Sequence, residues 1–286
     1  MRLPAQLLQR KRKAHKGDFG HVLILAGCLR FSGASILCAN SAMRAGAGLV
    51  TLGLPEGLAQ SIIKRKPPEV MLKPLAQTSR LTLSLKAYPQ IKAILKTVDI
   101  LIIGPGLSQD KSTQHLIQRL IRVIDKPVVI DADGLNALCG HLGVLVKNKN
   151  RPQFVLTPHP GEMARLLGVT TKNIQADRKQ IAKSFAKAYA VTVVLKGFQT
   201  IIADYRCKLY INKTGNPGMA AAGSGDVLAG IIGAFLAQGL DSFAAAKYAV
   251  YLHGLAGDLA AKQKTELAMI ASDIIDNIPR AIKLSS

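Results

Sequence analysis

Aromatic and acidic residues are the scarcest in this chain of 286 residues. Tryptophan is absent and aromatic residues make up 5% of the total, which leaves few rings on which nucleic-acid bases could stack. Asp and Glu number 17 against 38 Lys and Arg, so the formal net charge is +21. Such a charge attracts phosphate groups, but the basic residues are spread along the chain and their densest cluster, Arg10 to Lys16, is short. We therefore expect a solvated basic surface that favours small anionic substrates, and no nucleic-acid partner.

Several familiar patterns are also missing. No run of about eighteen apolar residues occurs, so we expect no membrane-spanning helix, and no apolar segment of signal-peptide type precedes the first strand. The absence of Cys-x-x-Cys, His-x-x-x-His, G-x-x-x-x-G-K-[ST], G-x-G-x-x-G and G-x-S-x-G argues against the zinc sites, P-loops, Rossmann loops and serine hydrolases that carry them. The four cysteines are scattered, which predicts buried free thiols in a reducing compartment, the cytoplasm: Cys28, Cys38, Cys139 and Cys207.

Apolar strands that alternate with helices predict an α/β fold. We expect buried strands at 21–26, 49–54, 70–72, 99–103, 127–130, 154–156 and 191–195, and an antiparallel ribbon at 200–203 and 208–211. We expect helices at 33–44, 85–96, 112–124, around 135, and at 161–167, 176–190, 226–238, 243–261 and 271–282. Nearly all-apolar strands indicate a mainly parallel sheet that is covered on both faces. We expect a single domain over 1–286, with a basic N-terminal arm at 1–15. Ligands of such sheets bind at the carboxyl ends of the strands, where the informative loops of this chain fall.

The most informative loop runs from Asn216 to Asp226 and opens directly into an apolar helix. Its small residues let the backbone approach a ligand closely, and free amides at a helix start favour an anion. Asp226 is placed to take a proton from a hydroxyl that attacks phosphorus. The pattern therefore suggests phosphoryl transfer at Gly223 to Asp226. The alternative is a flexible turn and a helix that Ser224 or Asp226 simply caps.

Two further loops follow strands. Gly104-Pro105-Gly106 forms a rigid turn whose bare backbone can lie against a ligand, although many surface turns look like it. Asp131 and Asp133 could hold Mg²⁺ through water or orient a hydroxyl. For Asp133 we expect the ordinary role of helix N-cap, whereas the role of Asp131 stays open.

A histidine and a lysine stand out in the second half of the chain. Prolines on both sides fix the backbone of His159, so we favour a ligand contact over a structural role for it. Glu162, three residues on, could equally interact with the dipole of the following helix. Lys196 ends a strand and could face a nucleotide phosphate, or it could belong to a hairpin with a glycine turn.

Taken in order, these loops closely resemble those of the ADP-dependent NAD(P)H-hydrate dehydratases, members of the ribokinase-like superfamily. The Gly-x-Gly-Asp element alone would indicate only a ribokinase-like kinase, and the T-P-H-P-G-E and N-x-T-G-N segments narrow the resemblance. It implies a three-layer α/β/α sandwich with a mainly parallel central sheet. The matching segments cover most of the chain: 16–20, 32–34, 44–50, 104–107, 131–136, 156–162, 195–197, 212–216 and 223–226.

The resemblance implies a repair reaction catalysed by a hydro-lyase. The S epimer of hydrated NADH or NADPH is dehydrated to the working cofactor at the expense of ADP, which gives AMP and phosphate. Asp226 would be the catalytic base, Mg²⁺ would screen the nucleotide phosphates, and no residue is assigned as a direct metal ligand. The implied contacts to the hydrated cofactor are Ala34, Gly106, His159 and Asp226. The implied contacts to ADP or AMP are Lys196, Gly197, Phe198, Gln199, Thr200 and Gly225, and the implied anion hole is Gly223, Ser224 and Gly225.

The resemblance also suggests partners. Relatives are often tetrameric, and many carry an epimerase domain ahead of the dehydratase. About fifteen residues precede the first motif here, so we expect the NAD(P)H-hydrate epimerase to be a separate chain. The segment before the last helix departs from the family pattern, because Lys264 to Ala268 stands where relatives have a Gly-Glu-Arg-Gly-like sequence. The alternatives are a small-molecule kinase of the same superfamily, for example a hydroxymethylpyrimidine or hydroxyethylthiazole kinase, and a nucleotide-binding regulator or RNA-binding protein.

Overall fold

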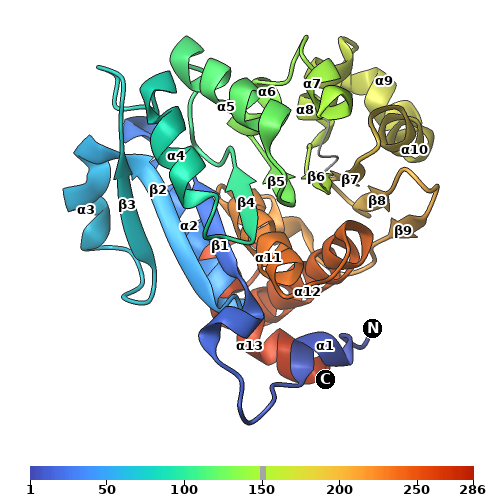
Figure 1. Ribbon diagram of the computed structural model, residues 1–286. Helices are drawn as coiled ribbons and strands as arrows, with labels where there is room; N and C mark the ends of the chain where they lie inside the picture. The colour runs from blue at the N-terminus through green and yellow to red at the C-terminus, as the bar shows by residue number, and fades with distance from the viewer. Residues whose placement is uncertain (149–152) are drawn as a thin grey trace.

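One nine-stranded sheet forms the centre of the computed structural model, which describes residues 1–148 and 153–286 (Figure 1). The strand order is β3-β2-β1-β4-β5-β6-β7-β8-β9. Strands β1 to β7 pair in parallel, and β8 and β9 add an antiparallel edge. This confirms the expected mainly parallel sheet. The strands are β1 (His21–Leu25), β2 (Leu49–Pro55), β3 (Met71–Leu75), β4 (Ile100–Ile103), β5 (Val128–Ile130), β6 (Phe154–Leu156), β7 (Thr192–Leu195), β8 (Ile201–Ala203) and β9 (Leu209–Ile211).

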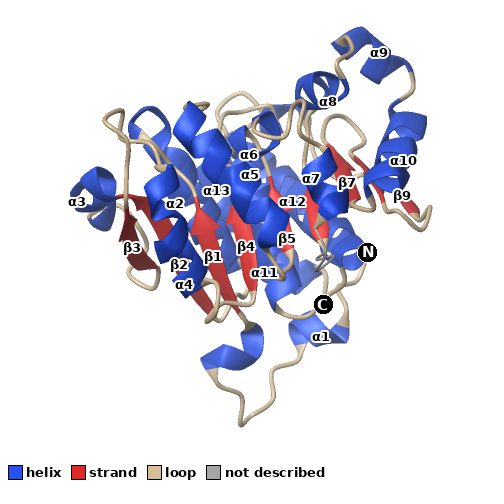
Figure 2. Cartoon of the chain, turned by 45° about the horizontal axis from the view of Figure 1, so that its top comes forward, coloured by secondary structure: helices blue, strands red, loops and turns tan. Residues whose placement is uncertain are grey.

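Helices cover both faces of the sheet, as Figures 1 and 2 show. The α-helices are α1 (Ala5–Leu8), α2 (Ser32–Arg44), α3 (Ala59–Ile63), α4 (Tyr88–Ile94), α5 (Lys111–Val123), α6 (Asp133–Asn136), α7 (Gly143–Lys147), α8 (Pro160–Leu167), α9 (Thr171–Ala176), α10 (Arg178–Tyr189), α11 (Ser224–Ala237), α12 (Ser242–Lys264) and α13 (Ala271–Leu284). The 3₁₀ helices are η1 (Lys16–Phe19), η2 (Leu29–Phe31), η3 (Glu56–Leu58), η4 (Leu85–Ala87) and η5 (Pro217–Met219).

The two faces of the sheet bury two separate apolar cores. Successive side chains of a strand point to opposite faces, so Val22 and Ile24 of β1 join the core under α2, α11, α12 and α13. Leu23 and Leu25 of the same strand join the core that α4, α5, α7 and α10 cover. Burial on both sides explains why the central strands read as unbroken apolar runs.

Some expected elements differ from the observed ones. The helix expected at 176–190 is confirmed as α10 and begins two residues later, because the carboxylate of Asp177 accepts the amide of Gln180 and caps it; the short helix α9 before it was not expected. The short helices α1, α3 and α7 were not expected, since each is too short to show a periodic apolar pattern. All four cysteines are free, but the expectation that they are buried holds only for Cys28 and Cys38, whereas Cys207 is exposed.

The two ends of the chain lie together. The amide of Leu3 donates to the carbonyl of Ser285 at 2.7 Å, and the amide side chain of Gln6 donates to the carbonyl of Gln238 after α11. Helix α11 starts at the carboxyl edge of the sheet, so its end and the N-terminal arm lie at the amino edge (Figure 1). None of the helices in the described residues combines the length and apolarity needed to cross a lipid bilayer.

Candidate active site

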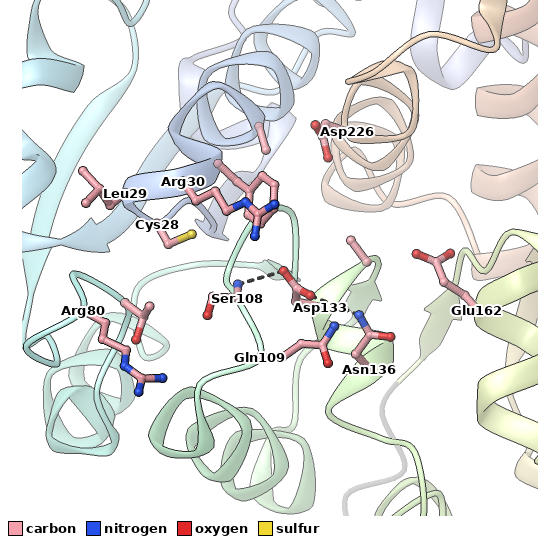
Figure 3. Close-up of a pocket in the computed structure, with 15 residues that line it drawn as sticks. Cys28, Leu29, Arg30, Arg80, Ser108, Gln109, Asp133, Asn136, Glu162 and Asp226 are labelled. Carbon is pink, nitrogen blue, oxygen red and sulfur yellow. Dashed lines mark hydrogen bonds between the residues drawn. The ribbon is translucent and has the colours of Figure 1, made fainter.

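A cavity of about 770 Å³ opens at the carboxyl ends of the strands (Figure 3). Its size is within the range of small-molecule sites. Three carboxylates approach it from different elements, Asp133 from α6, Glu162 from α8 and Asp226 from the start of α11. Two arginines, Arg30 and Arg80, line it as well. The other lining residues are Cys28, Leu29, Phe31, Ala34, Thr82, Gly106, Ser108, Gln109, Ala132 and Asn136.

The glycines of the Gly104-Pro105-Gly106 turn allow close packing at the cavity wall. Both have a positive φ, 129° for Gly104 and 62° for Gly106. A Cβ on Gly106 would stand 2.7 Å from the carbonyl oxygen of Phe31 and 3.0 Å from the Cβ of Ala34. The turn therefore needs glycine, and it brings Gly106 against the start of α2, so that Gly106 and Ala34 line one wall.

Helix α11 begins without a side-chain cap. Its N-cap is Gly223, with φ 88°, which has no side chain to cap the helix, so the alternative that Ser224 or Asp226 merely caps the helix is wrong. The amide of Ser224 donates to the carbonyl of Ala221 at 3.3 Å. Within the described part of the chain, the amides of Gly225 and Asp226 have no backbone acceptor, and free amides at a helix start attract anions.

The carboxylate of Asp226 faces the cavity (Figure 3). In residues 1–148 and 153–286 no hydrogen bond or salt bridge to it is found. Burial and, to a smaller extent, the neighbouring Asp131 carboxylate raise the pKa of Asp226 from 3.8 to about 7, although Lys196 acts in the opposite direction. A carboxylate whose pKa lies near neutrality is well suited to accept a proton at physiological pH.

A buried charge network lies beside Asp226. The ammonium of Lys196, at the end of β7, lies 2.7 Å from Oδ1 of Asp131, at the end of β5, and 3.7 Å from Oε2 of Glu162. The hydroxyl of Thr157, after β6, donates to the same Asp131 oxygen at 2.7 Å. Burial alone would lower the pKa of Lys196, but the carboxylates of Asp131 and Glu162 outweigh it and raise that pKa above its usual value. The network therefore keeps a permanent positive charge near Asp226.

This network was not expected from the sequence, although Asp131, Glu162 and Lys196 each stood out separately. Asp131, Thr157 and Lys196 each directly follow one of three adjacent parallel strands, β5, β6 and β7. That shared position is the signal that could have joined them, because the carboxyl ends of neighbouring parallel strands meet at one edge. The expectation that Asp133 is a helix N-cap is wrong. Ala132 holds that position, and the Asp133 carboxylate instead accepts the amide of Ser108 at 2.8 Å.

His159 has a local structural role at the start of α8. Its Nδ1 accepts the amides of Gly161 at 3.0 Å and Glu162 at 3.3 Å, and the Glu162 carboxylate in return accepts the amide of His159 at 2.7 Å. Burial lowers the pKa of His159, although Glu162 acts in the opposite direction. The lowered pKa favours the neutral ring, which this capping requires. His159 does not itself line the cavity, but Glu162, which it orients, does.

The turn between β7 and β8 lies next to the start of α11. It forms the expected hairpin, with positive φ at Gly197 and Gln199. The side chain of Arg178 in α10 donates to the carbonyls of Leu195, Lys196 and Phe198 and so fixes the turn. Phe198 is 87% exposed. A Cβ on Gly225 would stand 3.3 Å from the ammonium of Lys196, so this turn and the start of α11 adjoin.

Helix α12 holds the loop that precedes α11. Asp258 accepts the amide of Gly215 at 3.0 Å and the side-chain amide of Asn216 at 3.1 Å, and the hydroxyl of Thr214 donates to the carbonyl of Tyr251. The buried ring of His253 lies 3.3 Å from the hydroxyl of Ser224. Neither His253 nor Asp258 was foreseen, because both lie in a helix whose other residues read as core. Both fix the backbone that presents Asp226.

Comparison of the sequence and the fold of this chain with those of known proteins identifies its family. The family model described as NAD(P)H-hydrate dehydratase matches residues 22–280. The chain belongs to this family, whose members are hydro-lyases. Solved structures support the same assignment: an ADP/ATP-dependent NAD(P)H-hydrate dehydratase from Bacillus subtilis, co-crystallized with ATP/Mg²⁺, superimposes with a TM-score of 0.84, at 32% identity, with 100% of this chain and 95% of that chain covered. These findings confirm the resemblance and the ribokinase-like fold.

Two curated relatives show how the family varies. The chain is 46% identical over 279 residues to the bifunctional NAD(P)H-hydrate repair enzyme of Moorella thermoacetica, which covers 98% of this chain and 52% of that enzyme. It is 35% identical over 260 residues to the ADP-dependent (S)-NAD(P)H-hydrate dehydratase of Neisseria meningitidis, covering 91% and 83% of the two chains. The chain thus spans about half the length of the bifunctional relatives. A hydroxyethylthiazole kinase from Pyrococcus horikoshii shares the fold, with a TM-score of 0.62 at 16% identity.

Proposed function

We propose that this protein dehydrates the S epimer of hydrated NADH and NADPH with ADP as the phosphoryl donor, releasing AMP and phosphate. The observation that carries the proposal is the Asp226 carboxylate, which faces a cavity beside free amides and has a pKa of about 7. Family membership supplies the substrate class, and the site supplies groups suited to the chemistry.

The proposed reaction has two steps. In the first, Asp226 takes the proton of the ring hydroxyl, whose oxygen attacks the terminal phosphorus of ADP, and AMP leaves. The free amides at the start of α11 stabilise the negative charge on the transferred phosphoryl oxygens. In the second, the carbon–oxygen bond breaks, a neighbouring ring carbon loses a proton, and the ring double bond returns as phosphate departs. Phosphate is a far better leaving group than hydroxide.

The two substrates would enter from opposite sides of Asp226. We infer that the hydrated nicotinamide lies in the cavity against Ala34 and Gly106, with His159 close by. The nucleotide would lie along the turn from Lys196 to Thr200 and against Gly225, which adjoins that turn. This arrangement would place the terminal phosphoryl group between the ring hydroxyl and the helix start.

Mg²⁺ fits this site only as a companion of the nucleotide. Within the described residues, no group of three or more His, Cys, Asp or Glu could hold a metal ion. Mg²⁺ is commonly held by one or two carboxylates together with substrate phosphates. Asp131 has one oxygen, Oδ2, near Gly225, while Oδ1 is paired with Lys196. We infer that Asp131 Oδ2 would hold the ion through water, where Mg²⁺ would neutralise phosphate charge.

A direct assay tests the proposed function. Incubation of the protein with ADP and (S)-hydrated NADH is expected to restore the absorbance band of the reduced nicotinamide, with one AMP and one phosphate formed for each NADH. A phosphorylated product that accumulates without recovery of this band would indicate a true kinase instead. Strong, salt-dependent RNA binding without nucleotide turnover would indicate an RNA-binding protein.

His159→Ala is expected to weaken the binding of the hydrated cofactor, which raises its KM with a smaller change in kcat. The substitution also removes the helix cap, at a cost of about 1 kcal/mol in the free energy of unfolding. His159→Asn separates the two roles, because asparagine can still cap the helix but has no imidazole. We expect His159→Asn to restore stability but not the KM. A normal KM in both variants would leave His159 with its structural role alone.

The remaining expectations follow from the family. We infer that an NAD(P)H-hydrate epimerase is the functional partner, since only one epimer would be the substrate. We also propose a homotetramer in the cytoplasm with ADP as the preferred donor, in line with the naming of the Neisseria meningitidis relative. The oligomeric state is measurable by light scattering, and the donor by comparing ADP with ATP in the assay above.

A further inference from the structure

A second cavity, of about 450 Å³, adjoins the first. Gln109 and Asn136 line both, so the two are neighbouring cavities. The remaining residues of the second cavity are Gln114, Gln118, Ala137, Cys139, His141 and Arg165. The proposed reaction uses none of these six.

The two cavities differ in charge. Asp133, Glu162 and Asp226 put three carboxylates into the first, whereas the lining of the second includes the guanidinium of Arg165 and no carboxylate. The first cavity also holds Arg30 and Arg80, so its carboxylates outnumber its guanidiniums by three to two, whereas the second cavity has a guanidinium and no carboxylate to oppose it. An anionic group on a ligand that spans both is therefore favoured in the second cavity, at Arg165. The second cavity is also rich in side-chain amides, which can both donate and accept hydrogen bonds.

Arg165 is held in place for an anion. Its Nε donates to Oδ1 of Asn136 at 3.0 Å, and Nδ2 of Asn136 donates to Oδ1 of Asp133 at 3.0 Å. Figure 3 shows the second of these bonds. Among the described residues no salt bridge occupies Arg165. A guanidinium fixed through Nε keeps its two terminal nitrogens for a bidentate contact, the geometry that suits a phosphate.

We propose that the second cavity binds the adenosine half of the hydrated dinucleotide, and that Arg165 binds the 2′-phosphate that distinguishes hydrated NADPH from hydrated NADH. This inference rests on the proposed function, because that function places the nicotinamide half at Asp226. A dinucleotide has two nucleoside halves joined by a pyrophosphate, so its second half must lie beyond the first cavity. Gln118, whose side chain donates to the carbonyl of Ala137 at 2.8 Å, forms a fixed wall for it.

Steady-state kinetics with both hydrates test the proposal. Arg165→Gln is expected to lower kcat/KM for (S)-hydrated NADPH by about tenfold to hundredfold, because a charge-assisted contact to phosphate is lost. For (S)-hydrated NADH the same variant should change kcat/KM by less than about threefold, because this substrate has no 2′-phosphate for Arg165 to bind. Arg119→Gln is the matched control, since Arg119 stacks on Tyr88 and lines neither cavity. Equal effects on the two hydrates, or none on either, would overturn the proposal. So would a selective loss for hydrated NADPH in Arg80→Gln, which changes the first cavity, in place of Arg165→Gln.

A binding experiment separates this inference from the proposed function. With the nucleotide site saturated by AMP, adenosine 2′,5′-bisphosphate is titrated into wild type and Arg165→Gln by calorimetry. We expect the variant to bind it at least about tenfold more weakly, because the 2′-phosphate loses its charged partner. Equal affinities would refute the assignment of Arg165 even if the enzyme repairs hydrated NADPH. Failure of the wild type to turn over either hydrate would refute the proposed function, while the titration would still decide what the second cavity binds.

Discussion

Asp226→Asn is expected to lower the turnover of hydrated NADH by about 10²–10⁴-fold, the usual contribution of a general base. Asparagine has nearly the same shape but accepts no proton from the ring hydroxyl. Because only the proton acceptor is lost, the affinity for ADP should stay within about threefold of wild type. A lower kcat with unchanged binding would show that the substitution affects the chemical step. Asp125→Asn, which changes an exposed carboxylate remote from the cavity, is the matched control. Near-normal turnover in Asp226→Asn would remove Asp226 from its assigned role.

The same substitution is expected to stabilise the fold at neutral pH. The pKa of Asp226 is about 7 in the folded protein and 3.8 without the fold. The folded state therefore binds the proton more tightly, and ionisation of Asp226 weakens the fold as the pH rises from about 4 to about 7. Asparagine carries no charge and removes this cost in the free energy of unfolding. The cost is on the order of a few kcal/mol, since each pKa unit corresponds to about 1.36 kcal/mol. Urea unfolding should show equal stability of wild type and variant near pH 4, and a more stable variant above pH 7. Equal stability above pH 7 would show that the carboxylate is well solvated, and a less stable variant there would show that the ionised carboxylate stabilises the fold.

Lys196→Met is expected to lower the free energy of unfolding and to shift the pH dependence of kcat/KM. It leaves the buried carboxylates of Asp131 and Glu162 without their cation, and breaking such a buried pair costs about 3–5 kcal/mol. Lys196 also lowers the pKa of Asp226, so its loss should raise that pKa above about 7. Turnover requires the ionised Asp226, hence kcat/KM should rise with pH through about 7 in wild type and through a higher pH in the variant.

Two further variants make this test specific. Lys64→Met removes an exposed lysine and should leave both stability and the midpoint unchanged. Lys196→Arg keeps the positive charge and should keep the midpoint near that of wild type even where its packing lowers the rate. An unshifted midpoint in Lys196→Met would mean that the acidic limb of the profile belongs to another group.

The strands and the loop that presents Asp226 were predictable because each leaves a local signature. Buried parallel strands read as apolar runs such as 100–103, and the Gly223 to Asp226 loop combines small residues with an acid at a helix start. The charge network was not predictable in the same way, since Asp131 and Lys196 are 65 residues apart and meet only when β5, β6 and β7 are placed side by side. Asp133 was misjudged because a carboxylate at a helix start can serve the amide of a distant loop, here Ser108, as well as its own helix.

The bond between Leu3 and Ser285 has a consequence for how such proteins can be assembled. Both ends of the chain meet at the amino edge of the sheet, and the cavity that Asp226 faces opens at the carboxyl edge. An extra module tethered at either end would hang on the side away from the entrance and leave substrate traffic unhindered. This geometry explains how relatives about twice as long can accommodate a second catalytic unit, and it makes the fold a good candidate for engineered fusions and circular permutation.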